Sequence, residues 1–157
     1  RVFIAYGCCI EGFIAGAKPI LYIDGSHLSG PYKGTLLSAS ASDADNELLL
    51  FAIAIVHGDT IQDWSWFLEM VRRTLEGLQI TIVSNRHNAI IAAVRGVFGS
   101  KRHAYCYRHI KENFSAQMIK LNRGKRTICG QQRQTTLQLL DAIAYARLDY
   151  DFESAME

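Results

Sequence analysis

The chain has 157 residues, of which 49% are hydrophobic and 10% aromatic. This length suits one domain with a real core, and this composition excludes an intrinsically disordered chain. No apolar run approaches the roughly 18 residues that span a bilayer and no N-terminal signal is visible, so the sequence predicts no membrane partner. Because the chain begins with Arg1 and ends within a helical pattern, we expect it to be a piece of a longer protein.

The cysteines and the charges indicate the environment and the partners of the chain. Its four cysteines show no paired spacing of a small secreted scaffold, which favours a reduced, intracellular setting. The net charge is only +2, but one block is strongly basic, with Glu112 as its single acid. The bases of this block are Lys101, Arg102, Arg108, Lys111, Lys120, Arg123, Lys125, Arg126 and Arg133. The block is typical either of a phosphate-binding surface, which Arg86 would extend, or of a solvated helix end and loop.

Residues 2–16 are apolar and small, and predict a short helix or strand that packs on a sheet. Apolar or alternating runs then predict strands at 19–23, 35–42, 48–56 and 80–83, with a short edge strand at 101–105. Apolar residues at helical spacing predict a helix that Thr60 or Asp63 caps and that reaches Leu78, with Trp64 and Phe67 in the core and Trp66 partly exposed. Further helices are predicted from Arg86 to Phe98, over 106–121 and over 136–147, a polar loop at 124–134, and an interrupted helix at 152–157.

The predicted order is βββαβαβα, followed by one more helix. Short connections make the first three strands antiparallel, and right-handed βαβ units extend them into one mixed five-stranded sheet flanked by helices. If the strand at 80–83 lies beside the strand at 19–23 and parallel to it, Asp24 and Asn85 face each other at one sheet edge. This α/β arrangement is ribonuclease H-like.

Two carboxylates at neighbouring strand ends would make a two-metal phosphoryl-transfer site, because hard cations such as Mg²⁺ need anionic oxygen ligands. Asp24 suits the first ligand, with Gly25 leaving room for substrate, although an aspartate that caps a turn fits the same residues. Asn85 keeps a carbonyl oxygen but has no negative charge. Its alternative role, or that of Ser84, is to cap a helix that begins at Arg86.

Cys106 and His109 form a Cys-x-x-His pair at the predicted start of a helix. This spacing can supply two zinc ligands, but a structural zinc site needs four, which His103, Cys129 or Cys8 would have to complete. A buried cysteine and a hydrogen-bonded histidine are the alternative. His27, near Asp24, is either a further ligand or a residue that stabilises the turn.

Several segments resemble the transposase domain of Mutator-like elements (MULE) and the related far-red-response regulators derived from such transposases in plants. Residues 18–30 are similar to the family's P-I-x-x-D-G-T-H-L-x-G block, and residues 63–68 to its x-W-x-W-F-L helix. Residues 82–86 fall on its I-x-S-D-R strand end, and residues 106–114 on its C-x-x-H-I-x-x-N-F signature.

The resemblance implies a ribonuclease H-like core with a DDE triad that uses Mg²⁺ or Mn²⁺ to cut and join DNA, with DNA as partner, a nuclear location and a possible homo-oligomer. Asp24 takes the place of the first acid and Asn85 that of the second. The third, a glutamate, lies in the family downstream of an inserted helical region, so no residue here receives that role. We therefore expect a partial core over 1–123, the beginning of the insertion over 124–157, and no catalysis, either in a decayed transposase or in a domesticated DNA-binding, transcription-regulatory module.

Overall fold

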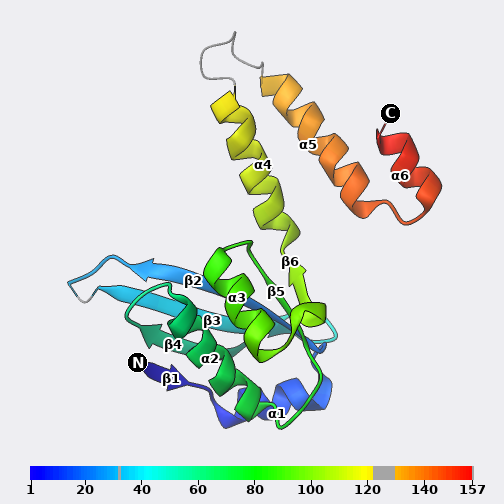
Figure 1. Cartoon of the computed structure of the whole chain (residues 1–157). Helices are drawn as coiled ribbons and strands as arrows, with labels where there is room; N and C mark the ends of the chain where they lie inside the picture. Colours follow the sequence, from blue (N-terminus) through cyan, green and yellow to red (C-terminus); the bar gives the residue numbers. More distant parts are fainter. Residues whose placement is uncertain (32, 122–129, 157) are drawn as a thin grey trace. The chain divides into compact units, whose positions relative to one another are not determined.

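The structure of the chain, a computed structural model, describes residues 1–31, 33–121 and 130–156 (Figure 1). The chain divides into two compact units, Arg1–Tyr105 and Cys106–Glu157. The first unit is a mixed α/β unit and the second is helical in the part that the structure describes. The boundary predicted after residue 123 falls outside the described residues and stays a prediction.

The first unit is built on one six-stranded mixed sheet with the strand order β1-β4-β3-β2-β5-β6. Its elements are β1 (Val2–Ile4), α1 (Gly7–Gly16), β2 (Ile20–Leu28), β3 (Gly34–Ser42), β4 (Leu48–Val56), α2 (Ile61–Thr74), β5 (Thr81–Ser84), α3 (Asn88–Val97), the 3₁₀ helix η1 (Ser100–Arg102) and β6 (His103–Tyr105). The strands β2, β3 and β4 form an antiparallel meander, whereas β5 pairs parallel with β2 and β6 parallel with β5. The predicted parallel pairing of the strand at 80–83 with the strand at 19–23 is confirmed.

The predicted number of five strands is wrong, because β1 adds a sixth strand at the edge of β4. Residues 2–16 form both a strand and a helix instead of one of the two. The backbone of β1 pairs antiparallel with β4, with Phe3 opposite Ala54. The Phe3 ring lies 5.9 Å from the ring of Phe67, so this edge strand also contributes an apolar side chain to the core side of the sheet.

The core lies between one face of the sheet and the helices α2 and α3, which lie over the same face in Figure 1. Alternation along β3 shows this directly, because every second residue from Thr35 to Ala41 is buried. Trp64 and Phe67 of α2 are fully buried, as predicted, and Trp66 is half-buried beneath the Arg1 guanidinium. The prediction that α2 continues to Leu78 is wrong, because the helix ends at Thr74 and a turn at Glu76 and Gly77 leaves Leu78 exposed.

The start of α2 is fixed by a reciprocal cap, which decides between the two predicted capping residues. The Thr60 hydroxyl accepts a hydrogen bond from the Asp63 backbone N–H and donates to the Asp63 carboxylate at 2.8 Å. That carboxylate also accepts from Arg1 at 2.8 Å. Burial works to raise the pKa of Asp63, but the hydrogen bonds from Thr60 and Arg1 hold it below its usual value.

The second unit contains α4 (Tyr107–Leu121), α5 (Gly130–Tyr145) and α6 (Asp149–Met156). Part of the predicted loop is wrong, since residues 130–134 belong to α5, where glutamine and arginine are good helix formers. The rest of that loop, 124–129, lies outside the described residues. The final helix begins at Asp149, three residues earlier than predicted. None of the described helices is long and apolar enough to cross a membrane.

Candidate active site at the sheet edge

Asp24 and Asn85 occupy level positions on neighbouring strands. The parallel register pairs Tyr22 with Val83, two residues before each of them. Asn85 directly follows β5, and continuing the register sets it beside Asp24 on the same sheet face, at the strand spacing of about 4.8 Å. Both residues are half-buried. The geometry therefore sets one carboxylate and one amide side by side.

The Asp24 carboxylate is engaged locally. Its Oδ1 accepts a hydrogen bond from the Gly25 backbone N–H at 2.9 Å, while its backbone carbonyl accepts one from the Ser38 hydroxyl at 3.3 Å. A side chain at position 25 would come within 3.1 Å of the buried Trp64 ring. Gly25 thus leaves room for the Trp64 ring. The sequence had predicted that it leaves room for substrate.

Asn85 makes a turn ahead of α3. Its Oδ1 accepts a hydrogen bond from the His87 backbone N–H at 2.9 Å, and α3 begins at Asn88 with His87 as the N-cap residue. The predicted helix start at Arg86 is therefore two residues too early. Neither Asn85 nor Ser84 is the N-cap residue, although Asn85 orders the backbone that leads into the helix.

Ser84 instead joins β5 to β6. Its hydroxyl donates to the backbone carbonyl oxygen of Asn85 at 2.7 Å and lies 2.8 Å from Nε2 of His103. Burial lowers the pKa of His103, which favours the neutral imidazole. Because the hydroxyl donates its proton to Asn85, the His103 Nε2–H donates to Ser84 in this arrangement. Ser84 and His103 thus stabilise the strand that carries Asn85.

A second carboxylate near this edge, Asp59, was not singled out from the sequence. It follows β4, which runs in the same direction as β2 because two antiparallel pairings separate them. One carboxylate oxygen accepts a hydrogen bond from the Trp64 indole N–H, and the other lies 3.5 Å from Nδ1 of His87. An acid shortly after an apolar strand was the available signal, the same one that pointed to Asp24.

The residues at this edge do not fit a two-metal site. Of the two aligned positions only Asp24 supplies an anionic oxygen, and the amide oxygen of Asn85 is already an acceptor for a backbone N–H. Within the described parts of the chain, no group of three or more histidine, cysteine, aspartate or glutamate side chains is arranged to hold a metal ion. The donor set suits at most one weakly held cation at Asp24.

The other described residues that were predicted as metal ligands lie in helices or strands, or next to them, and most contact neighbouring protein groups. Cys106, a half-buried free thiol, precedes α4, and His109 lies in the first turn of that helix, with Nε2 3.4 Å from an Arg108 nitrogen. His27 lies within β2, opposite Thr35 of β3, and its Nδ1 lies 3.4 Å from the Thr35 hydroxyl. The predicted role in a turn is therefore wrong, because β2 continues through His27 to Leu28. Cys129, a further predicted zinc ligand, lies outside the described residues. Zinc at Cys106 and His109 stays a prediction.

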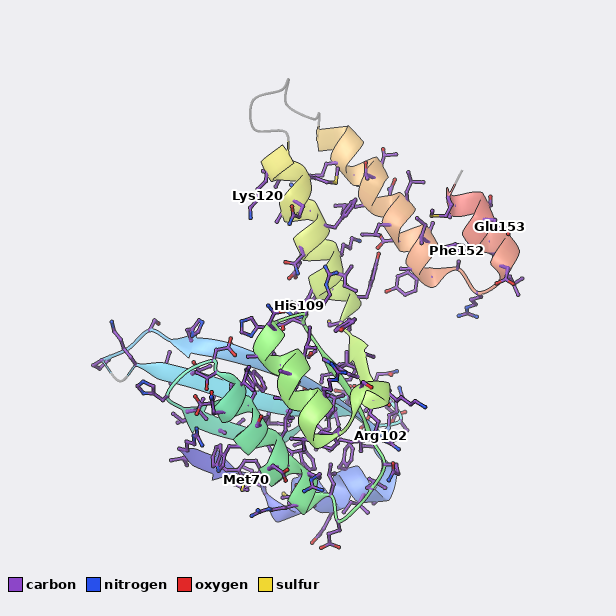
Figure 2. All side chains as sticks on the ribbon, viewed as in Figure 1. Met70, Arg102, His109, Lys120, Phe152 and Glu153 are labelled. Atoms are coloured by element: carbon purple, nitrogen blue, oxygen red, sulfur yellow. The ribbon has the colours of Figure 1, made fainter. Side chains whose placement is uncertain are left out.

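The predicted nucleic-acid contacts are divided between the two units. Those of the first unit are Arg86, between β5 and α3, and Lys101 and Arg102, in η1. Those on α4 of the second unit are Arg108, Lys111 and Lys120. Figure 2 labels Arg102 in the first unit and Lys120 near the end of α4. Those outside the described residues are Arg123, Lys125 and Arg126.

The charges of α4 are partly neutralised within the second unit. The Lys111 ammonium donates to both oxygens of Asp141, at 2.6 and 2.8 Å. Arg108 lies 3.8 Å from Glu112 on the exposed surface, a pair that water screens. Lys120 is exposed. Arg108 and Lys120 therefore keep more of their charge available to a phosphate than Lys111 does.

Comparison with known families finds a family model that matches this part of the chain. Residues 20–113 match the model of the MULE transposase domain, and this range runs from β2 into α4. Because the match covers more than half of the chain, the chain belongs to the MULE transposase domain family. The matched range contains both Asp24 and Asn85, as well as Cys106 and His109.

The chain is also similar to Protein FAR1-RELATED SEQUENCE 6 of Arabidopsis thaliana. The two are 23% identical over 91 residues, which is 58% of this chain and 13% of the relative. The chain thus spans only a small part of the length of that relative.

Proposed function

We propose that this chain is, by descent, a DDE-type transposase domain of a Mutator-like DNA transposon with a ribonuclease H-like core, and that in its present form it binds DNA without cutting it. The family match supports the descent. The parallel pairing of β5 with β2 supports the core, because it places the end of β5 beside Asp24 in the middle of β2. The beginning of the inserted helical region corresponds to residues 124–157.

The observation that carries the loss of cleavage is the asparagine level with Asp24. Two-metal phosphoryl transfer needs anionic ligands that hold both cations and stabilise the charge that develops in the transition state. An amide in place of the second acid removes one of these charges, and its oxygen is occupied by the His87 N–H. Asp24 holds Mg²⁺ or Mn²⁺ weakly in this proposal, and no residue of the chain takes the role of the third acid.

DNA binding relies on exposed bases that contact phosphates. Arg86 and Lys101 of the first unit and Arg108 and Lys120 of the second are exposed. Lysine and arginine contacts to phosphates release counterions, so the duplex affinity should fall steeply as salt rises. An affinity that does not change with salt would contradict phosphate contact.

A second candidate function is a domesticated, non-enzymatic DNA-binding or transcription-regulatory module that acts in the nucleus. The similarity to Protein FAR1-RELATED SEQUENCE 6 favours it, because the sequence resembles regulators derived from such transposases. The surrounding gene separates the two candidates. Terminal inverted repeats or a downstream glutamate indicate a transposon, whereas a stable gene without either indicates domestication.

A DNA-nicking assay tests the proposed loss of cleavage. We expect the unaltered chain to leave supercoiled DNA intact in Mg²⁺ or Mn²⁺, and the Asp24→Ala variant to behave identically. In the full-length protein, Asn85→Asp should restore metal-dependent cleavage if the other parts are intact. Cleavage by the unaltered protein that Asp24→Ala abolishes would overturn the proposal.

A further inference from the structure

The first unit has a pocket of about 450 Å³ at the end of the sheet opposite Asp24. The end of α2, the turn that leads into β5, the end of α3 and η1 line it. It opens beside the start of β5, whereas Asn85 follows the end of that strand. Four residues of strand span about 13 Å, so this pocket is distinct from the candidate active site.

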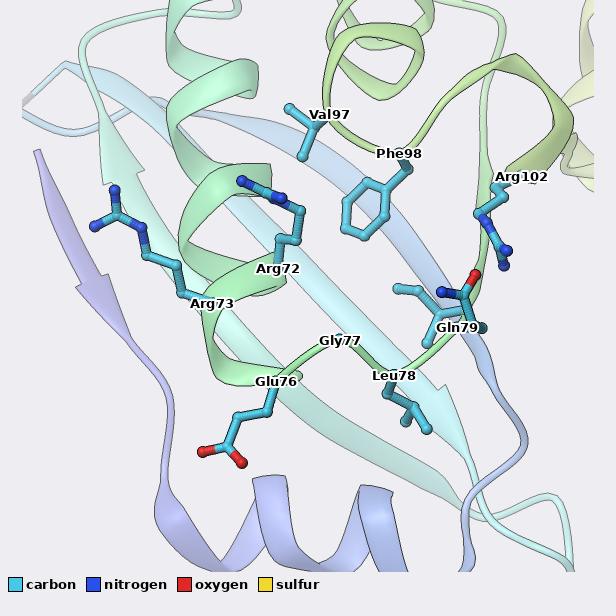
Figure 3. A pocket seen from close by; sticks show the side chains of 10 residues that line it. Arg72, Arg73, Glu76, Gly77, Leu78, Gln79, Val97, Phe98 and Arg102 are labelled. Carbon is cyan, nitrogen blue, oxygen red and sulfur yellow. The ribbon is translucent and has the colours of Figure 1, made fainter.

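The pocket combines an apolar floor with a cationic rim. Ile80 is buried at its base, while the half-buried Phe98 and the exposed Leu78 present apolar surface. Figure 3 shows the Phe98 ring between the side chains of Arg72 and Gln79, with Arg102 beside Gln79. A ligand that fills the pocket therefore needs a flat or apolar body as well as negative charge.

The turn after α2 gives the pocket its open side. Glu76 and Gly77 both have positive φ, at 48° and 89°, and the Leu78 N–H donates to the Leu75 carbonyl at 2.9 Å. This turn ends the helix and directs Leu78 and Gln79 along the pocket wall. The wall is thus built by ordered backbone.

The rim has positive charge to spare. Arg72 is bound to Glu69 at 2.9 Å on the surface, where 55% of its side chain is exposed. Among the residues that the structure describes, Arg102 and Arg73 form no ion pair. Of the described residues that line the pocket, Glu76 is the one acid, against three arginines, of which Arg72 is paired with Glu69. The rim therefore favours an anion.

Unpaired DNA satisfies both requirements better than the alternatives. Each nucleotide joins an apolar base face, which stacks on an aromatic ring, to a phosphate, which an arginine binds through two parallel hydrogen bonds. The volume lies in the range of sites for small ligands and admits a base that is not stacked in a duplex. Gln79 adds an amide that can bond a base edge. An acidic peptide matches the charge but lacks the flat ring that Phe98 accommodates.

We propose that this pocket binds unpaired nucleotides of a DNA strand, with a base against Phe98 and Leu78 and a flanking phosphate on Arg102. The pocket is a second DNA contact that extends the proposed DNA-binding function. It binds single strands, whereas the exposed bases of the proposed function bind duplex.

Fluorescence anisotropy with a labelled thymidine oligomer of about eight nucleotides tests this proposal in the whole chain. Arg102→Ala should weaken oligomer binding about tenfold, as loss of a charge-assisted hydrogen bond does. Phe98→Leu keeps an apolar side chain on the core and should weaken binding about fivefold or more. Arg95→Ala removes an exposed arginine of α3 outside the pocket and should change the affinity less than about twofold.

Equal oligomer affinity for the unaltered chain, Arg102→Ala and Phe98→Leu would overturn the proposal. Because Arg102 lies on the rim, its replacement gives an answer even if Phe98→Leu fails to fold. An alternating glutamate–phenylalanine peptide that binds more tightly than the oligomer, and loses this binding in Arg102→Ala, would also overturn it in favour of an acidic peptide.

A blunt duplex probe separates this proposal from the proposed function. Phe98→Leu should bind the duplex as the unaltered chain does. Duplex binding without oligomer binding contradicts only the pocket, whereas oligomer binding that the pocket variants lose, without duplex binding, supports the pocket and contradicts the duplex contacts.

Discussion

The close contact between Gly25 and Trp64 links the candidate site to the core. A Cβ at position 25 would lie 3.1 Å from the Trp64 ring, which is fully buried and whose N–H donates to Asp59. Gly25→Ala should therefore destabilise the first unit by about 1 kcal/mol, because overpacking outweighs the entropy that alanine removes from the unfolded chain. Urea unfolding followed by tryptophan fluorescence measures this, since both tryptophans lie in α2.

Gly12→Ala is the matched control for this prediction. Position 12 lies in α1 with open space around it, so alanine should stabilise the helix by about 0.5–1 kcal/mol. If Gly25→Ala is as stable as the unaltered chain, the Trp64 ring has room to move, and the proposed link between position 25 and the core is refuted.

At the residue scale, the sequence identified side chains better than it identified their partners. Asp24 and Asn85 were recognisable because each follows an apolar run in the sequence, and the pairing of β2 with β5 brings them level. The strand that was predicted to end before Asp24 continues to Leu28, because its backbone stays paired with β3. The bond from the His87 N–H to Asn85 depends on the local backbone path, and the bonds of Asp59 to Trp64 and His87 depend on tertiary packing. Apolar patterns do not record such contacts, so Asp59 was overlooked.

At the element scale, α4 and α5 are joined by a network around Asp141. The Tyr107 hydroxyl donates to Asp141 at 2.6 Å, beside the bonds from Lys111, and the Tyr107 ring lies 5.5 Å from that of Tyr145. Burial first, and then the Asp141 carboxylate, raises the pKa of Tyr107 to about 12. The bond from Lys111, followed by the one from Tyr107, lowers the pKa of Asp141.

This network predicts a pH dependence of the second unit. Because the pKa of Tyr107 is raised above its usual value of about 10, its stabilising effect is complete below pH 10 and is lost as the pH rises through about 12. Ultraviolet difference titration of the unaltered chain against Tyr107→Phe isolates this tyrosine. Asp141→Asn should lower the pKa of Tyr107, because the carboxylate that raises it is removed. Circular dichroism should then show loss of helix at a lower pH in that variant than in the unaltered chain.

Lys120→Ala, which leaves the network untouched, serves as the control. An ionisation of Tyr107 near pH 10 in the unaltered chain would show that the hydroxyl does not donate to Asp141 in solution.

Elements with strong periodicity were predictable, and their ends were less so. The apolar spacing of α2 identified Trp64 and Phe67 as core, but extended the helix to Leu78 because that residue continues the spacing beyond the turn. The three residues of β1 were too few for a periodic signal, and only the free edge of β4 makes them a strand. The polar composition of 130–134 resembled a loop, although its glutamines and its arginine have good helix propensity.

At the scale of the whole molecule, the bases that form one block in the sequence serve two units. Lys101 and Arg102 belong to the sheet unit, where Arg102 lines a pocket, whereas Arg108 and Lys120 lie on a helix of the second unit. The count of charges predicted a partner that carries phosphates, and the division of the bases between two units led us to propose separate contacts for duplex phosphates and for unpaired nucleotides.

We propose that Asn85 interrupts a metal site in which Asp24 still holds its position. Isothermal titration of Mn²⁺ into the unaltered chain, Asn85→Asp and the double variant Asp24→Ala/Asn85→Asp tests it most directly. We predict weak binding by the unaltered chain and a gain of about tenfold or more in Asn85→Asp, since an added carboxylate near the cation contributes more than the 1.4 kcal/mol that tenfold requires. The double variant should lose this gain, whereas equal Mn²⁺ affinity of the unaltered chain and Asn85→Asp would contradict the account.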